Sequence, residues 1–237
     1  MALPKLNETN WYEVEVPSTK QLVKYRPFLV KEQKQLLIAA ETEDQRVIVN
    51  SILDTINVCI QEDFEVRTLT SFDTDYLFSR IRGKSVGETS EIIIKCESCE
   101  HSNEVKVNIM DSTIKGEMKE GTIQLTPEIS VEMVYPSYMD LFKRDLFDEE
   151  GNPRGAHAVD MIASCIKAVI TEEERIDLKN ESKEEIDGFI DSLNSEQFER
   201  ISGFIQNMPK LVYDAEFVCE NCEKENKLTL EGIGNFF

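Results

Sequence analysis

Apolar and polar residues follow two different patterns near the start of the chain. Around Val14 and Val16 they alternate, and nearby prolines interrupt the segment, which predicts a short extended arm rather than a helix. From Lys31 to Ile60 the apolar residues recur every three or four positions, with a break and a new helix start at Thr42–Asp44. We therefore expect an N-terminal arm followed by two successive helices.

A third helix and a set of paired strands are predicted next. Helical spacing indicates a helix over Ser71–Ile81, and we expect Gly83 to stop it. The segment TSEIIIK is typical of a strand, CESC of a turn, and the alternating segment EHSNEVKVNI of a second strand, so this hairpin carries two cysteines at its turn. The segment GTIQLTPEISVEMVYPS adds two further predicted strands.

The chain then returns to helical spacing before a second strand, turn and strand. Ser182 and Glu185 fit a capping box at the start of one helix, and we interpret the acidic runs Thr171–Arg175 and Lys183–Asp187 as solvated helix faces. The sequence CENC lies between the strand-like segments AEFV and KLTLEGI. The predicted helices cover about Tyr138–Phe147, Ala156–Ile170, Ser182–Leu193 and Ser195–Met208.

The two C-x-x-C turns supply four thiols in matching surroundings, with a strand on each side of each turn. These cysteines are Cys96, Cys99, Cys219 and Cys222. One tight C-x-x-C turn can supply two thiolate ligands, and two such turns complete the tetrahedral shell that zinc prefers. The duplication of the turn predicts one structural four-cysteine zinc site.

The spacing between the turns departs from that of an uninterrupted zinc ribbon. Between Cys99 and Cys219 lie 119 residues, against roughly 15–20 in an ordinary ribbon. Loop-closure entropy grows only logarithmically with length, so a site that closes over an inserted region is tolerable. An iron–sulfur cluster, sites shared between subunits and hairpins without metal remain alternatives to one shared zinc site.

Other uses of the cysteines fit the pattern less well. A redox C-x-x-C usually opens a helix, whereas both pairs are predicted at strand turns, and a catalytic zinc keeps an open coordination position that four cysteines would close. His101 could compete as a ligand, but we expect a solvated turn residue. Cys59 and Cys165 fall on the apolar faces of predicted helices and are expected to be small core residues.

The predicted fold class is α+β. We expect a small antiparallel β zinc-ribbon-like module with a large helical insertion, together with an N-terminal extended arm plus helices. Residues 1–84 would form the arm and helices, and residues 136–209 the helical insertion. Residues 85–135 and 210–237 would together form the β module with its split four-cysteine metal site.

Composition narrows the classes of function. Hydrophobic residues make up 41% of the 237 residues and charged residues 30%, as in soluble globular proteins. No apolar stretch approaches a membrane span, and the start MALPKLNETNW resembles neither a signal peptide nor an anchor, so we expect a reducing cytosolic environment and no membrane partner. The net charge of −20 would repel a phosphate backbone, which disfavours nucleic acid as the main partner.

The sequence gives no sign of an enzyme. His101 and His157 are the two histidines, so a cysteine or serine nucleophile has few candidate bases. Carboxylates are too abundant for one pair to indicate acid–base chemistry, and no glycine-rich phosphate loop is present. We therefore expect neither catalytic nor cofactor-binding residues beyond the metal site.

Three features together resemble the baseplate hub and tail-assembly protein family of T-even-like contractile-tailed phages. They are the segment VPST…YRPFLVKEQKQLL, the paired cysteine turns, and the segment FVCENCEKENKLTLEGIGNFF. The resemblance implies a non-enzymatic protein that builds the central hub of the baseplate or forms part of it. It also implies other hub or tail proteins as partners, and a location in the virion tail baseplate or, during assembly, in the host cytoplasm.

The alternative function is a zinc-ribbon nucleic-acid-binding or transcription accessory protein. That function predicts basic residues around the cysteine turns, which instead read CESCEHSNE and CENCEKENK.

For a role in assembly, Phe236 and Phe237 are candidate contacts that either fold back onto the metal module or insert into a partner. Trp11 and Tyr12 in the N-terminal arm pose the same choice.

Overall fold

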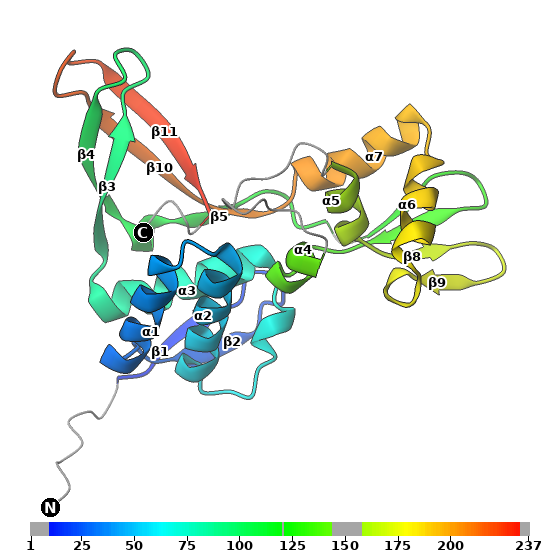
Figure 1. Ribbon diagram of the computed structural model, residues 1–237, viewed down its shortest axis with the longest axis horizontal. Helices are drawn as coiled ribbons and strands as arrows, with labels where there is room; N and C mark the ends of the chain where they lie inside the picture. The colour runs from blue at the N-terminus through cyan, green and yellow to red at the C-terminus, as the bar shows by residue number, and fades with distance from the viewer. Residues whose placement is uncertain (1–9, 120, 144–157, 233–237) are drawn as a thin grey trace, which may run out of the picture.

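The computed structural model describes residues 10–119, 121–143 and 158–232. Two lobes lie next to each other, and an arm of two β-hairpins projects beside the N-terminal lobe (Figure 1). Helices and antiparallel strands are mixed throughout the described residues, which confirms the predicted α+β class. Among these residues, no helix has both the length and the apolar character needed to cross a bilayer.

The N-terminal lobe packs a two-stranded hairpin against helices. Its elements are β1 (Tyr12–Glu15), β2 (Leu22–Tyr25), α1 (Val30–Glu41), α2 (Gln45–Cys59), a 3-10 turn (Val66–Thr68), α3 (Ser71–Val86) and, from later in the chain, α4 (Tyr138–Lys143). The extended N-terminal segment predicted from the sequence forms the β1–β2 hairpin, which is separate from the projecting arm. The predicted break between two helices is confirmed. At that break the Asp44 carboxylate accepts hydrogen bonds from the first turn of α2.

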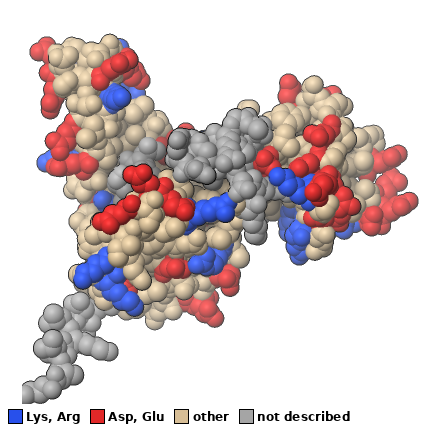
Figure 2. Space-filling view, viewed as in Figure 1, with Lys and Arg blue, Asp and Glu red and all other residues tan. Residues whose placement is uncertain are grey.

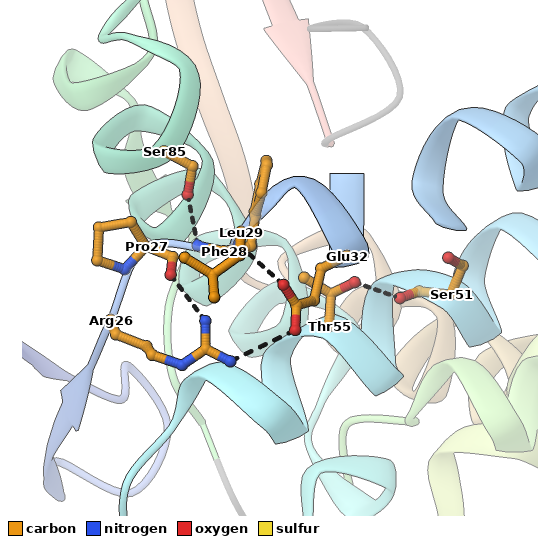
Figure 3. Close-up of polar contacts among 8 residues, drawn as sticks. All are labelled: Arg26, Pro27, Phe28, Leu29, Glu32, Ser51, Thr55 and Ser85. Carbon is orange, nitrogen blue, oxygen red and sulfur yellow. Dashed lines mark hydrogen bonds and ion pairs between the residues drawn. The ribbon is translucent and has the colours of Figure 1, made fainter. Parts of the chain in front are cut away.

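A buried carboxylate holds the start of α1 in place (Figure 3). Glu32 accepts a 2.8 Å hydrogen bond from the Leu29 amide, and the Arg26 guanidinium lies 3.4 Å from the same carboxylate. Burial opposes ionisation of Glu32, but these donors outweigh it and lower the pKa of the carboxyl group. One residue before Leu29, the Phe28 amide donates to Ser85 Oγ at 2.9 Å, which ties the entry of α1 to α3.

Helix α3 is longer than the sequence predicted. It passes Gly83 and ends at Val86, where Gly87 adopts a φ of 114° that favours glycine. A Cβ at position 83 would stand 2.6 Å from Met110 Sδ, so Gly83 allows the chain after β4 to approach the helix closely. The glycine therefore serves packing within the helix rather than ending it.

The arm is built from two antiparallel hairpins that enclose a small apolar core. Its strands are β3 (Thr89–Lys95), β4 (Ser102–Asn108), β5 (Thr113–Lys115), β10 (Lys210–Val218) and β11 (Glu225–Glu231). β3 pairs with β4, while β10 pairs with both β11 and β5. Val107 and Leu211, both fully buried, belong to the core shared by the two hairpins. At the base of the arm, the Arg80 guanidinium on α3 donates to the Met110 and Ser112 carbonyls.

The distal lobe has its own sheet and its own core. Its elements are β6 (Gly121–Gln124), β7 (Ser130–Met133), α5 (Ala158–Cys165), β8 (Ile166–Ile170), β9 (Arg175–Asp177), a 3-10 turn (Leu178–Asn180), α6 (Lys183–Asp191) and α7 (Ser195–Gln206). The strands pair antiparallel in the order β6-β7-β8-β9. Predicted helices α6 and α7 are present, and the Ser182–Glu185 capping box is confirmed.

Four predictions fail in this lobe. The helix predicted over Ala156–Ile170 becomes strand β8 at Ile166, because its apolar residues pair with β7. The strands predicted within residues 121–137 join β8 and β9 rather than the cysteine hairpins, and the segment 136–209 contains strands as well as helices. The acidic run Thr171–Arg175 forms an exposed turn that leads into β9 instead of a helix face. Residues 144–157 of the predicted helices lie outside the described residues.

Tyr135 joins the two lobes. Its ring stacks on Phe204 of α7 with the ring centres 4.9 Å apart, and it meets Phe72 of α3 edge-on at 5.4 Å. The Ser71 amide also donates to the Pro136 carbonyl at 3.1 Å. Aromatic contacts and backbone pairing thus connect α3 to the distal lobe.

Candidate metal centre

The first cysteine turn links β3 to β4 through a tight backbone loop. The Cys96 amide donates to the His101 carbonyl, and the Glu100 amide donates to the Cys96 carbonyl, both at 2.9 Å. Glu100 has a φ of 56°, the left-handed conformation that closes the turn. The Ser98 amide points toward Cys96 Sγ at 3.5 Å, as expected of a turn that presents its donors to a thiolate.

The second turn, between β10 and β11, repeats this geometry 123 positions later in the chain. The Cys219 amide donates to the Lys224 carbonyl, and the Glu223 amide donates to the Cys219 carbonyl, again both at 2.9 Å. Glu223 has a φ of 57°. The two turns are therefore the same structural unit, as the repeated sequence predicted.

The tips of the two hairpins lie at the same end of the arm (Figure 1). The four predicted cysteines come together there. All four sulfur atoms lie within 4.8 Å of one another. Cys96 Sγ lies 3.7 Å from Cys222 Sγ, and Cys99 Sγ lies 3.6 Å from Cys219 Sγ. A disulfide needs about 2.05 Å, whereas a zinc ion with four bonds of about 2.3 Å sets its sulfur atoms roughly 3.8 Å apart. The donor set thus has the chemistry and the spacing of a tetrathiolate site.

Two buried asparagines connect the turns to each other. Asn103 Oδ1 accepts from the Glu220 amide at 2.9 Å, and Asn226 Oδ1 accepts from the Glu97 amide at 3.1 Å. Each side-chain amide also donates within its own turn, Asn103 to the His101 carbonyl and Asn226 to the Lys224 carbonyl. The sequence analysis did not identify these residues, although the pattern C-x-x-C-x-x-x-N occurs in both turns.

The turns also bias the ionisation of the thiols. Hydrogen bonds from the Ser98 amide, and then from the Cys99 amide, lower the pKa of Cys96 to about 6. A backbone donor at Lys224 favours the Cys222 thiolate, but the neighbouring sulfurs outweigh it and raise its pKa to about 12. Four thiolates so close together repel one another, and a bound cation would remove that repulsion.

The other two cysteines and His101 stand apart from this cluster. Cys59 and Cys165 are fully buried in apolar clusters, where burial raises the pKa of the first thiol to about 11 and of the second to about 12. Both predictions of core cysteines are therefore confirmed. His101 is exposed and does not belong to the sulfur cluster, while His157 lies outside the described residues.

The surface around the cluster is mainly acidic. Glu97, Glu100, Glu220 and Glu223 are all exposed on the two turns, and acidic side chains are visible at the tip of the arm (Figure 2). Lys224 Nζ lies 2.6 Å from Ser98 Oγ, which adds one exposed contact between the turns. The hairpin tip therefore lacks the basic surface expected of a nucleic-acid-binding ribbon.

Comparisons with known proteins place the chain in a family. No curated protein and no solved structure gives a significant match. The family described as T4 bacteriophage base plate protein matches residues 9–237, which include both lobes, the arm and all four clustered cysteines. Because that match spans nearly the whole sequence, the chain belongs to the T4 bacteriophage base plate protein family.

Proposed function

We propose that this chain is a non-enzymatic structural or assembly protein of a contractile phage tail baseplate hub, and that a zinc ion bound by Cys96, Cys99, Cys219 and Cys222 closes its arm. Membership of the base plate family supports the setting. The observation that carries the metal site is the convergence of four sulfur atoms within 4.8 Å. Other hub or tail proteins are the proposed partners, in the virion tail or in the host cytoplasm during assembly.

A structural role for the zinc follows from the closed ligand set. Four thiolates fill a tetrahedral shell and leave no position for water or substrate. The ion would join β3–β4 to β10–β11 at the end of the arm, where the asparagine hydrogen bonds and the contact between Lys224 and Ser98 also connect the turns. In this proposal the metal stabilises the surfaces of the arm and takes no part in a reaction.

Elemental analysis with native mass spectrometry of the purified full chain tests the metal site. We expect one zinc per chain, and loss of that zinc together with destabilisation of the arm in Cys219→Ser. Cys59→Ala is the matched control, because this cysteine lies in the core of the N-terminal lobe and should leave the zinc content unchanged. A full chain that folds and keeps an ordered arm without metal would refute the structural role. Visible absorbance of the purified protein would reveal an iron–sulfur cluster instead.

The baseplate role needs a separate test. Affinity purification of the tagged full chain from infected cells should recover hub or tail proteins, with less recovery when the arm is disrupted by Cys219→Ser. Salt-dependent binding of the purified chain to DNA would instead support the nucleic-acid-binding alternative. Recovery of no tail protein would contradict the assembly role.

A further inference from the structure

Helix α1 turns a largely apolar side toward solvent. Glu32 and Ala39 are its buried residues, and they lie on the side that packs against the rest of the N-terminal lobe. On the opposite side Val30, Leu37 and Ile38 are 65%, 58% and 64% exposed. A single exposed apolar residue is ordinary, but three large ones together on one short helix indicate a contact surface.

Two opposite charges lie on the same side of the helix as these apolar residues. Residues three or four positions apart share one side of a helix, and the set that we call the α1 stripe consists of Val30, Lys34, Leu37, Ile38 and Glu41. Lys34 and Glu41 are both exposed, and neither forms an ion pair within the part of the chain that the structure describes. The α1 stripe therefore offers one cation and one anion to a partner.

The charges around α1 are also separated along the surface. Basic side chains gather over the start of the helix and acidic ones over its end, with uncharged surface between them (Figure 2). Lys31 and Lys34 are exposed toward the start, while Glu41, Glu43 and Asp44 are exposed at the end and in the turn that follows. The two ends of α1 are therefore electrostatically complementary to each other, which favours a second copy of the same helix as the partner.

The spacing of the α1 stripe suits an antiparallel copy of itself. Leu37 lies three positions after Lys34, and Ile38 lies three positions before Glu41, so the apolar pair is midway between the charges. A twofold axis at that midpoint places Leu37 opposite Ile38 of the second copy, and Lys34 opposite Glu41 of the second copy. Every contact then forms twice. Parallel helices would instead place like charges opposite each other, which is unfavourable.

We propose that two copies of this chain associate through antiparallel α1 helices, with Leu37 and Ile38 at the centre and the Lys34–Glu41 pairs on either side. The association goes beyond the proposed baseplate role and does not depend on a metal ion, because α1 belongs to the N-terminal lobe. It adds a contact surface to those suggested by the sequence, of which Phe236 and Phe237 lie outside the described residues.

The size of this interface sets its strength. One helix from each copy buries less surface than the roughly 1,600 Å² of a standard stable complex, so we expect a reversible dimer with a dissociation constant in about the micromolar range. The apolar residues supply most of the affinity, while the exposed ion pairs mainly fix the orientation of the helices.

Sedimentation equilibrium of the purified full chain tests the association. A salt concentration of about 0.15 M screens the general repulsion between two acidic chains beyond about 8 Å. We expect the average mass to rise from that of one chain toward that of two through the micromolar range. Ile38→Ser should raise the dissociation constant by about tenfold, since it removes apolar contact from both copies. Val58→Ser is the control, because Val58 is 51% exposed on α2 and lies outside the α1 stripe.

An exchange of charges tests the antiparallel arrangement. Lys34→Glu and Glu41→Lys each replace two attractive pairs with two repulsive ones, so each should weaken the dimer by about tenfold. In an equal mixture of the two variants, the introduced carboxylate faces the introduced amine, and native Glu41 faces native Lys34. We therefore expect the mixed dimer to regain wild-type affinity. Lys183→Glu is the control, because it changes the net charge equally at an exposed position of the distal lobe.

Several outcomes would overturn the proposal. They are a wild-type chain that stays monomeric throughout the micromolar range, a dimer that Ile38→Ser does not weaken more than Val58→Ser, and equal weakening by Lys34→Glu and Lys183→Glu. A mixture of Lys34→Glu with Glu41→Lys that binds no more tightly than either variant alone would exclude the antiparallel pairing. Circular dichroism checks that every variant retains the helical content of the wild type, so that a change in mass reports association.

Discussion

Asn103 and Asn226 are equivalent residues of the two cysteine turns, and each accepts a hydrogen bond from the backbone of the opposite turn. Their exposed fractions are only 2% and 3%. Because each side-chain amide also donates to a carbonyl of its own turn, the pair fixes the distance between the two hairpin tips. The cysteines are thereby held near one another by contacts that do not involve sulfur.

Replacing either asparagine should weaken the proposed metal site. Asn103→Ala leaves the Glu220 amide without its buried acceptor and loosens the alignment of the turns. We expect zinc affinity to fall by about 10- to 100-fold, the usual effect of losing a contact that orients metal ligands. Competition with a chromophoric chelator measures this change. Glu220→Gln is the control, since the Glu220 side chain is exposed on the second turn and the substitution keeps the backbone amide that donates to Asn103, and equal losses in both variants would contradict the role of Asn103.

Removal of the metal should loosen the arm selectively. With the ion absent, the thiolates at the tip repel one another or take up protons. The small apolar core of the arm must then hold the two hairpins together. We expect amide hydrogen exchange in β4 and β11 to accelerate by about tenfold or more after chelation, which corresponds to at least about 1.4 kcal/mol of local stability. Amides of α2 belong to a separate core and should be unaffected. Equal acceleration in α2 and the arm would contradict this prediction.

Two glycines should respond in opposite ways to alanine. Gly116 has a φ of 126°, and a Cβ there would lie 2.7 Å from Pro209 Cα, so Gly116→Ala combines backbone strain with a clash against backbone. We expect a loss of about 1–3 kcal/mol in the free energy of unfolding. Gly188 lies inside α6 with open space around it, and Gly188→Ala should stabilise the protein by up to about 1 kcal/mol. Urea denaturation of both variants provides the measurement, and a similar loss in both would be inconsistent with this geometry.

Glu32 should make the stability of the N-terminal lobe depend on pH. Its pKa in the folded protein is lowered from the ordinary value of 4.5, because donors from Leu29 and Arg26 outweigh the effect of burial. A lowered folded pKa gives a contribution that is present above pH 4.5 and is lost as the pH falls through the folded value. We therefore expect Glu32→Gln to cost about 1–3 kcal/mol at pH 7 and progressively less below pH 4.5.

Urea denaturation across this pH range measures the effect of Glu32→Gln. Glu41→Gln is a suitable control, because Glu41 lies at the exposed end of the same helix. A difference between wild type and Glu32→Gln that stays constant from pH 7 to pH 3 would show that the charge of Glu32 does not contribute.

Local signals explain the parts of the fold that the sequence predicted. Asp44 is both the sequence signal for a new helix and the residue that caps α2, and Ser182 with Glu185 behaves likewise at α6. The convergence of the cysteines was also predictable, because two copies of one turn imply one shared partner. Asn103 and Asn226 belong to the same sequence repeat, so the sequence alone could have identified them as equivalent residues of the two turns.

The failures of prediction come from contacts between distant segments. Gly83 stays within α3 because Met110 packs against it, and no local pattern reveals that neighbour. Ile166–Ile170 forms a strand because β7 and β9 lie on either side of it, whereas its apolar residues alone suit a helix equally well.

The arm extends well beyond the N-terminal lobe (Figure 1). Strand β10 runs through nine residues from Lys210 to Val218 without interruption, a span of about 30 Å. One end pairs with β5 near α3, and the other end carries Cys219. A protein that bound the acidic tip would therefore contact the chain about 30 Å from the base of β10 beside α3.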